Sequence, residues 1–373
     1  MATALIVGGG ISGAATAIVL SRNGLTVDLV EREPSWNVLG SGITLIGPAL
    51  RALQHLGVLE ACLDVGFGVR EMTKRTIDGA EIETFPLPSS LGPEYPGLLG
   101  LMRPTLHAIL TAKAREEGLE VRTGTWPTSI ENVDDRARVT FNDGSSHDYD
   151  LVIGADGLRS QTRTMVFGDM RPTFQNQGCF RAVLPRHPDV DMEFDFVGWP
   201  GSHPGFTPMG DGLMYLYCNT AMPDASLIPQ AEIPARIREV IAPFGGVVGD
   251  VRELITDPQK VNYRPFETIL VPPPWHRGRV VLVGDSAHST TPQLAAGGAM
   301  CLEDAVVLGE ELERHESIPA ALAAYSERRY ERCRFVVETS VQISHWQNTI
   351  DAPGAETATA VTQAAYALLA QPF

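Results

Sequence analysis

The chain contains 373 residues, of which 44% are hydrophobic and 20% are charged, and it carries a net charge of −16. This length and mixture exclude a disordered chain and a small domain that needs disulfides or a metal to fold, and they suggest roughly two to three modules. A strongly acidic surface argues against nucleic acid or an anionic membrane as the main partner.

The first 21 residues lack charged side chains, so an export signal or a membrane span must be considered. No basic residue precedes the apolar run, no cleavage site of small residues follows it, and four glycines interrupt it. The five cysteines are scattered without a C-x-x-C pair, which is typical of reduced thiols. We therefore expect a soluble, cytoplasmic protein.

The chain opens with a predicted strand, helix and second strand. The apolar run 4–7 indicates a buried strand, and apolar residues at helical spacing indicate a helix that ends at Asn23-Gly24. Residues 26–31 predict the second strand, which ends at Glu31. A unit of this kind implies a parallel sheet.

A glycine motif lies between the first strand and the helix. In Gly8-x-Gly10-x-x-Gly13, glycine allows a tight turn, the approach of a pyrophosphate and close packing of helix on strand. The helix N-terminus then faces the phosphates. Glu31 lies where an acid binds a ribose 2′-hydroxyl, so the motif favours FAD or NAD over NADP.

The middle of the chain changes from α/β to β-rich texture. A helix is predicted over 103–117, a hairpin turn at Asn142-Asp-Gly144, and a buried strand over 151–153. From about 171 to 271, prolines and short apolar runs predict an inserted β-rich domain. A buried strand over 280–283, a helix containing Cys301, a long helix from Ser317 to about Thr349 and a helical tail from Gly354 complete the prediction.

Two further segments follow predicted strands and resemble a known family. They are Gly154-Ala-Asp156-Gly157 and Gly284-Asp285-Ser-Ala-His288, the latter leading to Pro292. Together with the first glycine motif, they resemble the single-component FAD-dependent aromatic hydroxylases, the class A flavoprotein monooxygenases with the para-hydroxybenzoate hydroxylase fold. The resemblance extends from Ala4 to about Leu312.

The resemblance implies a fold and a domain division. The fold class is α/β, with a Rossmann-like FAD-binding domain, an inserted β-rich substrate domain and C-terminal helices. The expected FAD-binding domain is discontinuous, with segments 1–70, 101–170 and 271–315. The substrate domain is expected in 71–100 and 171–270, and the C-terminal helices in 316–373.

The cofactor implied by the resemblance is FAD, with NADH or NADPH as a transient co-substrate. The expected FAD-binding residues are Gly8, Gly10, Gly13, Glu31, Arg32, Thr44, Arg103, Asp156, Asp285, Gly297, Gly298 and Ala299. For three of these, Arg103, Asp156 and Asp285, a capping, turn or surface role stays open as the alternative. The chain has Ala295-Ala296-Gly297 where relatives usually carry Gly-Gln-Gly, which leaves the backbone donors in place. No clustered metal ligands are present in the sequence, so we expect no metal.

The reaction implied by the resemblance is hydroxylation of a small phenolic or N-heterocyclic aromatic compound. NAD(P)H reduces FAD, O2 adds at flavin C4a, and the hydroperoxide delivers the hydroxyl group. The expected catalytic residues are His203, Tyr215 and Pro292, with an exposed loop position as the alternative for His203 and a core position for Tyr215. Arg181 either anchors a carboxylate or pairs with a surface acid. The expected pocket walls are Trp199, Phe206, Met209, Tyr215 and Tyr217.

Other functions remain open at this point. The same flavin fold could catalyse epoxidation, inactivation of an antibiotic or reduction of a double bond. An ordinary NAD dehydrogenase and a non-enzymatic flavin sensor are further alternatives. The expected partners are an aromatic substrate, O2 and NAD(P)H, and the protein is expected to be a monomer or a homodimer.

Overall fold

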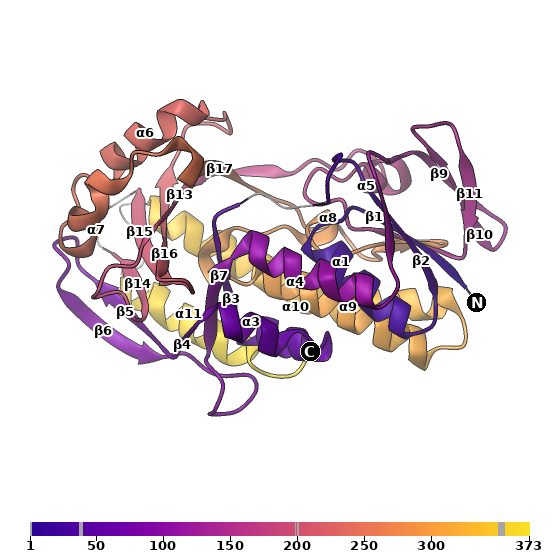
Figure 1. Cartoon of the computed structure of the whole chain (residues 1–373), viewed down its shortest axis with the longest axis horizontal. Coiled ribbons are helices and arrows are strands. Elements are labelled where there is room, and N and C mark those ends of the chain that lie inside the picture. The colour runs from indigo at the N-terminus through magenta and orange to yellow at the C-terminus, as the bar shows by residue number, and fades with distance from the viewer. Residues whose placement is uncertain (1, 37–39, 198, 200, 350–354) are drawn as a thin grey trace.

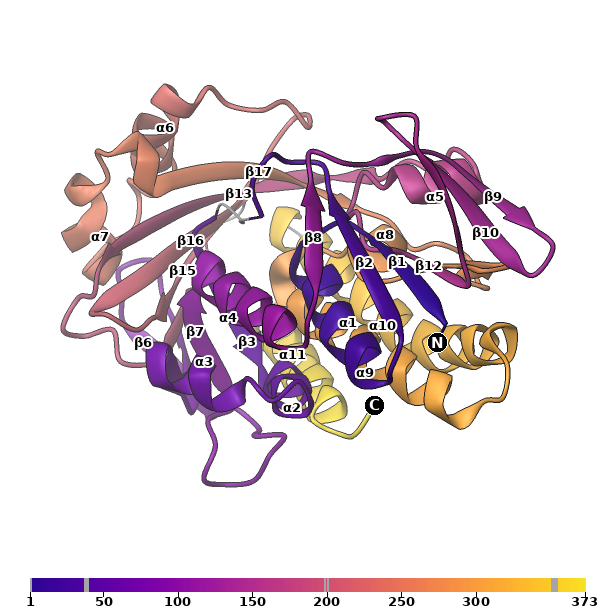
Figure 2. The same cartoon turned by 45° about the vertical axis from the view of Figure 1, so that its right-hand side comes forward.

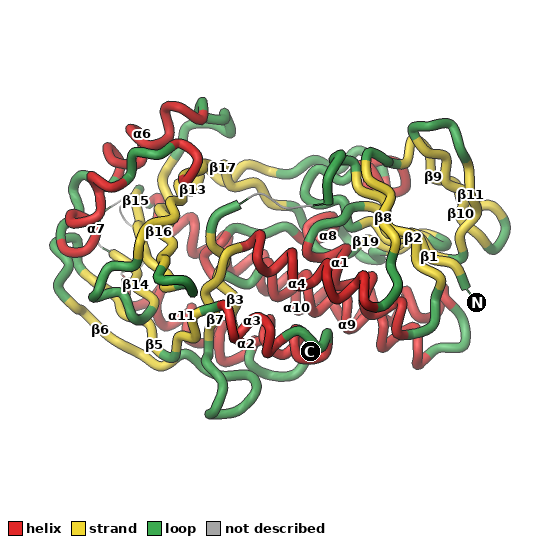
Figure 3. The backbone as a smooth tube through the Cα atoms, viewed as in Figure 1, coloured by secondary structure: helices red, strands yellow, loops and turns green. Residues whose placement is uncertain are grey.

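The protein was analysed as a computed structural model, which describes residues 2–36, 40–197, 199, 201–349 and 355–373. Figure 1 shows an elongated molecule with a sheet at each end and long helices between them. Figure 3 shows the same arrangement, with the strands gathered at the two ends and most helical turns in the middle. None of the helices within the described ranges is long and apolar enough to cross a membrane.

A six-stranded sheet forms the first end and has the order β18-β19-β12-β1-β2-β8. All neighbouring strands in it are parallel except β18 and β19. Its strands are β1 (Thr3–Val7), β2 (Thr26–Glu31), β8 (Glu120–Thr123), β12 (Leu151–Gly154), β18 (His276–Arg277) and β19 (Val280–Leu282). Since β1, β2, β12 and β19 run the same way, the three sequence motifs that follow β1, β12 and β19 meet at one edge of this sheet.

A second, seven-stranded sheet forms the other end and has the order β17-β13-β16-β15-β14-β5-β6. Its strands are β5 (Glu71–Arg75), β6 (Glu81–Pro86), β13 (Thr173–Pro185), β14 (Glu193–Phe196), β15 (Ser202–Pro208), β16 (Leu213–Ala221) and β17 (Val261–Thr268). Side chains alternate between its two faces. One face packs against α6 (Ile233–Val240) and α7 (Gly246–Val251) in a separate apolar core.

Two small sheets connect and flank these layers. One consists of β3 (Gly42–Ile46), β7 (Leu98–Met102) and β4 (Phe67–Val69). The other is an antiparallel sheet of β9 (Pro127–Val133), β10 (Arg136–Phe141) and β11 (Ser146–Tyr149). Short helices α2 (Gly47–His55), α3 (Leu59–Val65), α5 (Gln161–Phe167) and α8 (Asp285–His288) complete this part of the chain.

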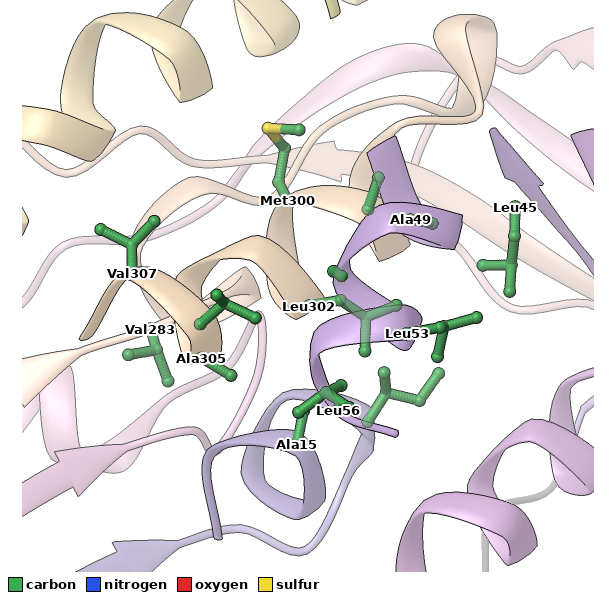
Figure 4. Packing of buried hydrophobic residues seen from close by; sticks show 14 of the residues in the cluster. Ala15, Leu45, Ala49, Leu53, Leu56, Val283, Met300, Leu302, Ala305 and Val307 are labelled. Atoms are coloured by element: carbon green, nitrogen blue, oxygen red, sulfur yellow. The ribbon is translucent and has the colours of Figure 1, made fainter. Parts of the chain in front are cut away.

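The main core lies where α1 (Ile11–Arg22), α2 and α9 (Gly297–Arg314) meet. Figure 4 shows Ala15 of α1, Leu53 of α2 and Leu302 and Ala305 of α9 within this buried cluster. The helices approach closely because small residues line the contacts, and a side chain at Gly309 of α9 would overlap Val19 of α1. This packing fixes the N-termini of α1 and α9 relative to each other.

The C-terminal helices join the two ends of the molecule. α4 (Arg103–Glu116) lies beside α1, whereas α10 (Ile318–Asn348) packs on α9 and continues to β13 and β15 of the second sheet, as Figure 2 also shows. Ser317 caps α10 by accepting a hydrogen bond from the Ala320 N–H, as its position at the start of the apolar pattern predicts. α11 (Ala355–Leu369) is the predicted tail helix, of which the expected start, Gly354, lies outside the described residues.

The structure confirms most of the predicted elements to within one or two residues. The βαβ unit, the helix at 103 and the hairpin turn at 142–144 are all present. Inside the β-rich region, the prediction missed helices α6 and α7, because each is too short for an apolar period to stand out. The proposed domain boundaries stay a prediction.

Candidate active site

A cavity of about 1100 Å³ begins at the edge of the first sheet and continues between the seven-stranded sheet and the C-terminal helices. At its first end it is lined by Gly10, Asp285 and Gly298, and at its far end by Lys74, Glu193 and Tyr366. A smaller hollow of about 360 Å³ adjoins it at Gly10. Together they form one elongated space that passes the glycine motif.

The glycine motif is shaped by two close backbone contacts. Gly8 has φ +102°, which side chains disfavour, and a Cβ on Gly13 would lie 1.9 Å from the Gly8 carbonyl oxygen. At Gly10, by contrast, a Cβ would meet nothing within 4 Å, because this residue faces the open cavity. The motif therefore leaves a phosphate-sized opening at the N-terminus of α1.

The smaller hollow has the features of an adenosine site. Glu31 lines it, and its Oε2 accepts a hydrogen bond of 2.8 Å from the Gly9 N–H. The Arg32 guanidinium lies 5.7 Å from the ring centroid of Trp126, another lining residue. A base stacked in this hollow would contact one aromatic face and one cation.

Asp285 is the strongest sign that a polar group belongs in the larger cavity. No described residue donates a hydrogen bond to the Asp285 carboxylate. Burial raises the pKa of this group. The hydroxyl oxygens of Ser12, Thr290 and Thr291, which also line the cavity, are buried without a partner in the same described part. Buried polar atoms are normally paired, so these residues fit the ribityl and phosphate groups of a dinucleotide such as FAD.

An ionic network behind Asp285 fixes the loop that carries it. Asp304 accepts hydrogen bonds from the Gly284 N–H at 2.7 Å, from His288 Nε2 at 2.6 Å and from Arg329 Nε at 2.8 Å. Arg329 also contacts Glu303 at 2.7 Å. Burial alone would raise the pKa of Asp304, but the charges of His288 and Arg329 keep it at about 2. His288 is buried in this network, with its Nε2 bonded to Asp304.

The remaining residues expected at the cofactor are distributed unevenly. Thr44, Arg103, Gly297 and Gly298 line the larger cavity, whereas Ala299 is buried behind it. Asp156 lies at the smaller hollow, but its carboxylate accepts hydrogen bonds from Ser160 Oγ and from the Thr162 N–H. The contacts of Asp156 are therefore those of a residue in a structural turn, the alternative left open by the sequence. Ser160 in the same turn caps α5.

The far wall of the cavity is one face of the seven-stranded sheet. Tyr215 and Tyr217 of β16 and Arg181 of β13 point from it into the cavity. Arg181 Nε donates a hydrogen bond of 2.8 Å to Tyr215 Oη, and no carboxylate in the described ranges pairs with its guanidinium. The prediction that Arg181 pairs with a surface acid is therefore wrong.

Four ionisable groups lie further along this wall. Tyr217 Oη donates to Glu193 Oε1 at 3.1 Å, while Glu193 Oε2 has no hydrogen-bond partner in the described part of the chain. Burial raises the pKa of Glu193 to about 8. Asp195, two residues along β14, forms an ion pair with Lys74 of β5.

Three predictions about the wall need correction. Phe206 points away from the cavity into the core beneath the sheet, because side chains alternate along β15, and Met209 is buried without lining the cavity. His203 is not in an exposed loop: it lies in β15, is 9% exposed and has Nε2 3.1 Å from the Gln347 carbonyl oxygen. Burial lowers the pKa of His203, so its ring is neutral at pH 7. Pro292 and Trp199 line the cavity as expected.

Sequence reasoning missed the acids on β14 and the contribution of the C-terminal helices. Glu193 and Asp195 alternate with Phe194 and Phe196, a pattern that predicts a strand with one acidic and one apolar face. That signal was available in the sequence. The cavity residues of α10 and α11, such as Trp346 and Tyr366, carry no local signal because only packing brings them to the wall.

This geometry agrees with comparisons with known proteins. Residues 1–340 match the family model described as FAD binding domain, so the chain belongs to this family of FAD-binding proteins. It is an FAD-dependent monooxygenase, with NAD(P)H as co-substrate, of the class that hydroxylates aromatic and heterocyclic compounds.

Three similar proteins illustrate the range within this class. The chain is 35% identical over 314 residues to 2-heptyl-3-hydroxy-4(1H)-quinolone synthase of Pseudomonas aeruginosa, covering 82% of this chain and 79% of the relative. It is 31% identical to 3-hydroxybenzoate 6-hydroxylase 1 of Aquipseudomonas alcaligenes, covering 88% and 85%. The crystal structure of Klebsiella pneumoniae HpxO with FAD and uric acid superposes with a TM-score of 0.84 at 26% identity, covering 100% of this chain and 93% of that one.

Proposed function

We propose that the protein hydroxylates a neutral bicyclic N-heterocycle with a ring N–H and a conjugated carbonyl group, as in a 4-quinolone. The observation that carries this proposal is Arg181, a cation in the cavity whose hydrogen-bond partner is the phenol of Tyr215 rather than a carboxylate. The remaining guanidinium N–H groups have no acceptor among the described residues and can donate to a carbonyl oxygen. Aromatic and apolar neighbours such as Trp346 and Leu98 suit the flat faces of such a ring.

The likeness to the quinolone-forming relative supports the same substrate class. That protein is named for a 3-hydroxy-4(1H)-quinolone, a ring with N–H and carbonyl groups joined through a carbon–carbon double bond. Electron density in such a ring moves from the nitrogen to the carbon next to the carbonyl group. A donor at the oxygen therefore binds one end of this conjugated system and fixes the position of the carbon that is oxidised.

FAD is proposed to extend through both hollows. The residues proposed to bind it are Gly8, Gly10, Gly13, Glu31, Arg32, Thr44, Arg103, Asp285, Gly297 and Gly298, within a domain formed by segments 1–70, 101–170 and 271–315. Asp156 and Ala299 are proposed to support the site without contacting FAD. The Asp156 carboxylate is already bonded within its own turn, and Ala299 is buried behind the cavity. The bound cofactor, once reduced by NAD(P)H, supplies the activated oxygen, and the chain orients the ring towards it.

The roles proposed for the wall residues follow from their contacts. Arg181 and Tyr215 donate to the substrate oxygen, and Tyr215 is oriented for this by the Arg181 Nε hydrogen bond. Neutral His203, held at the Gln347 carbonyl group, shapes the ring pocket and offers one ring nitrogen. Pro292 closes the cofactor side. Together they exclude water, which would otherwise waste the activated oxygen.

A hydroxylated aromatic acid is the second candidate, because an unpaired guanidinium also binds a carboxylate. Both candidates are tested by rapid mixing of the flavin-loaded protein with NADH or NADPH in the presence of 4-quinolones, 3-hydroxybenzoate, 6-hydroxynicotinate or urate. The proposal expects a large acceleration of flavin reduction by a quinolone and, under ¹⁸O2, a product labelled with one ¹⁸O atom. Acceleration by the acids alone would refute it in favour of the second candidate.

A further inference from the structure

The deepest part of the cavity contains ionisable groups that the roles assigned so far leave unused. They come from neighbouring strands of one sheet face. Glu193 lies beside Asp195 on β14, with Tyr217 on β16 and Lys74 on β5. The cavity reaches all four of them.

The contact between Tyr217 and Glu193 depends on an unusual packing arrangement. Gly205 of β15 lies between Tyr217 of β16 and Asp195 of β14, and a Cβ on Gly205 would lie 2.3 Å from the Tyr217 ring. The missing side chain allows this ring to cross β15, so that its hydroxyl group reaches Glu193 Oε1 at 3.1 Å. Only one carboxylate oxygen is bonded in this way, and Oε2 has no partner among the described residues.

The two acids differ in their surroundings. Asp195 is paired with Lys74 and is thereby neutralised. No cation in the described part of the chain is bonded to Glu193, although Glu193 is 4% exposed and lies in the wall of a cavity. A buried carboxyl group in a cavity wall, with one oxygen bonded to Tyr217 and the other without a partner among the described residues, is suited to proton transfer.

We propose that Glu193 is the proton acceptor of the reaction, taking the ring N–H proton of the substrate while Arg181 binds the conjugated oxygen at the other side of the ring. This inference rests on the proposed function, whose substrate class it makes more specific. It explains why a donor and an acceptor line the same wall: they complement the carbonyl and N–H ends of one conjugated ring.

The step balances with the co-substrates of the class. The N–H bond breaks, its proton goes to the Glu193 carboxylate, and its electron pair enters the ring and raises the nucleophilicity of the carbon beside the carbonyl group. A C–O bond forms at that carbon with one atom of O2, and the hydrogen on the carbon leaves as a proton that restores the N–H group. The oxygen now bonded to the carbon takes a proton from solvent to become the hydroxyl group, and the other oxygen atom becomes water with the hydride of NAD(P)H and the proton held by Glu193.

The raised pKa of Glu193, about 8, is consistent with this role, because a base works best when its pKa lies near the working pH. The charged and titratable groups that face Glu193 or lie along its wall are Asp195, Lys74, Tyr217, Tyr215, Arg181, His203 and Tyr366. Burial and Asp195 disfavour the carboxylate, whereas the hydroxyl groups of Thr207 and Tyr217 and the charge of Lys74 favour it. The active carboxylate form therefore becomes populated as the pH rises through about 8.

The test compares wild type with Glu193→Gln, using the flavin-loaded protein and a 4-quinolone that accelerates flavin reduction. We expect ring hydroxylation to fall by about 10²- to 10³-fold in E193Q, and the rise of the rate with pH to disappear, while flavin reduction by NAD(P)H persists. On the N-methylated substrate, which has no proton to lose, the two proteins should react at the same rate. The surface variant Glu239→Gln, on α6, serves as the matched control with unchanged rates.

Tyr217→Phe keeps the test valid if E193Q does not retain flavin. Loss of the Tyr217 hydrogen bond raises the pKa of Glu193, so the pH profile of hydroxylation should shift towards higher pH by up to about one unit. If the pH profile of hydroxylation in E193Q is the same as in wild type, Glu193 is not the proton acceptor. If E193Q does not retain flavin, an unchanged pH profile in Y217F leads to the same conclusion. If no quinolone accelerates flavin reduction in the wild type, the proposed substrate class fails instead, so the two failures are distinguishable.

Discussion

The buried network around Arg329 offers the sharpest test of how the fold supports the cofactor site. Replacement of Arg329 by Met removes the Nε contact to Asp304 at 2.8 Å and the Nη1 contact to Glu303 at 2.7 Å, and all three side chains are fully buried. Met has similar length but offers no donor. Two carboxylates are then left in a medium of low polarity with fewer partners.

The expected loss follows from what remains. Glu303 keeps its two contacts to Arg332, and Asp304 keeps His288 and the Gly284 N–H. Breaking one side of a buried ion pair costs about 3–5 kcal/mol, and these remaining contacts place the R329M loss near the lower end, about 3 kcal/mol. Because Asp304 also holds the Gly284 N–H next to Asp285, FAD should dissociate more readily.

The assay is urea unfolding of the flavin-loaded protein at pH 7, followed by flavin fluorescence and circular dichroism. Arg334→Met is the matched control on the same helix, since the Arg334 side chain is 39% exposed and pairs with Glu331 and Glu338 on the surface. The control should lose less than about 1 kcal/mol. A loss in R329M no larger than in R334M would refute the argument that the buried network stabilises the site.

Three further predictions concern the cofactor site and the wall. Gly13→Ala should destabilise the fold because its Cβ would collide with the Gly8 carbonyl group. Gly10→Ala should unfold like wild type in the absence of FAD but bind FAD more weakly. Equal unfolding midpoints of the two variant apoproteins would contradict this prediction. Trp126→Ala should weaken FAD binding roughly tenfold by removing a stacking face, as measured by flavin titration, and an unchanged dissociation constant would exclude adenine from this hollow. Glu193 has its pKa raised from 4.5 to about 8, so the folded state binds one more proton than the unfolded state between these values. The free energy of unfolding of wild type should therefore fall by up to about 1.4 kcal/mol per pH unit relative to E193Q as the pH rises from about 5 to 8; parallel curves would show that Glu193 is ionised in the fold.

The nucleotide-binding half was determined largely by local sequence. A strand, a glycine motif and a helix follow one another within the first 22 residues, and the steric demands at Gly8 and Gly13 can be inferred without knowledge of the rest of the chain. The position of the motif that contains Asp285 was equally predictable, because parallel strands bring their carboxyl ends to one edge. These contacts are short in range or follow from topology alone.

The substrate wall was decided only by the tertiary structure. Residues of β5, β14, β16 and α11 come from four distant parts of the sequence, and only strand pairing and helix docking place Lys74, Glu193, Tyr217 and Tyr366 around one cavity. Alternation along a strand indicates that Phe206 and His203 face opposite sides, but not which side is the cavity. That choice depends on α6 and α7, which cover one face of the sheet and leave the other facing the cavity.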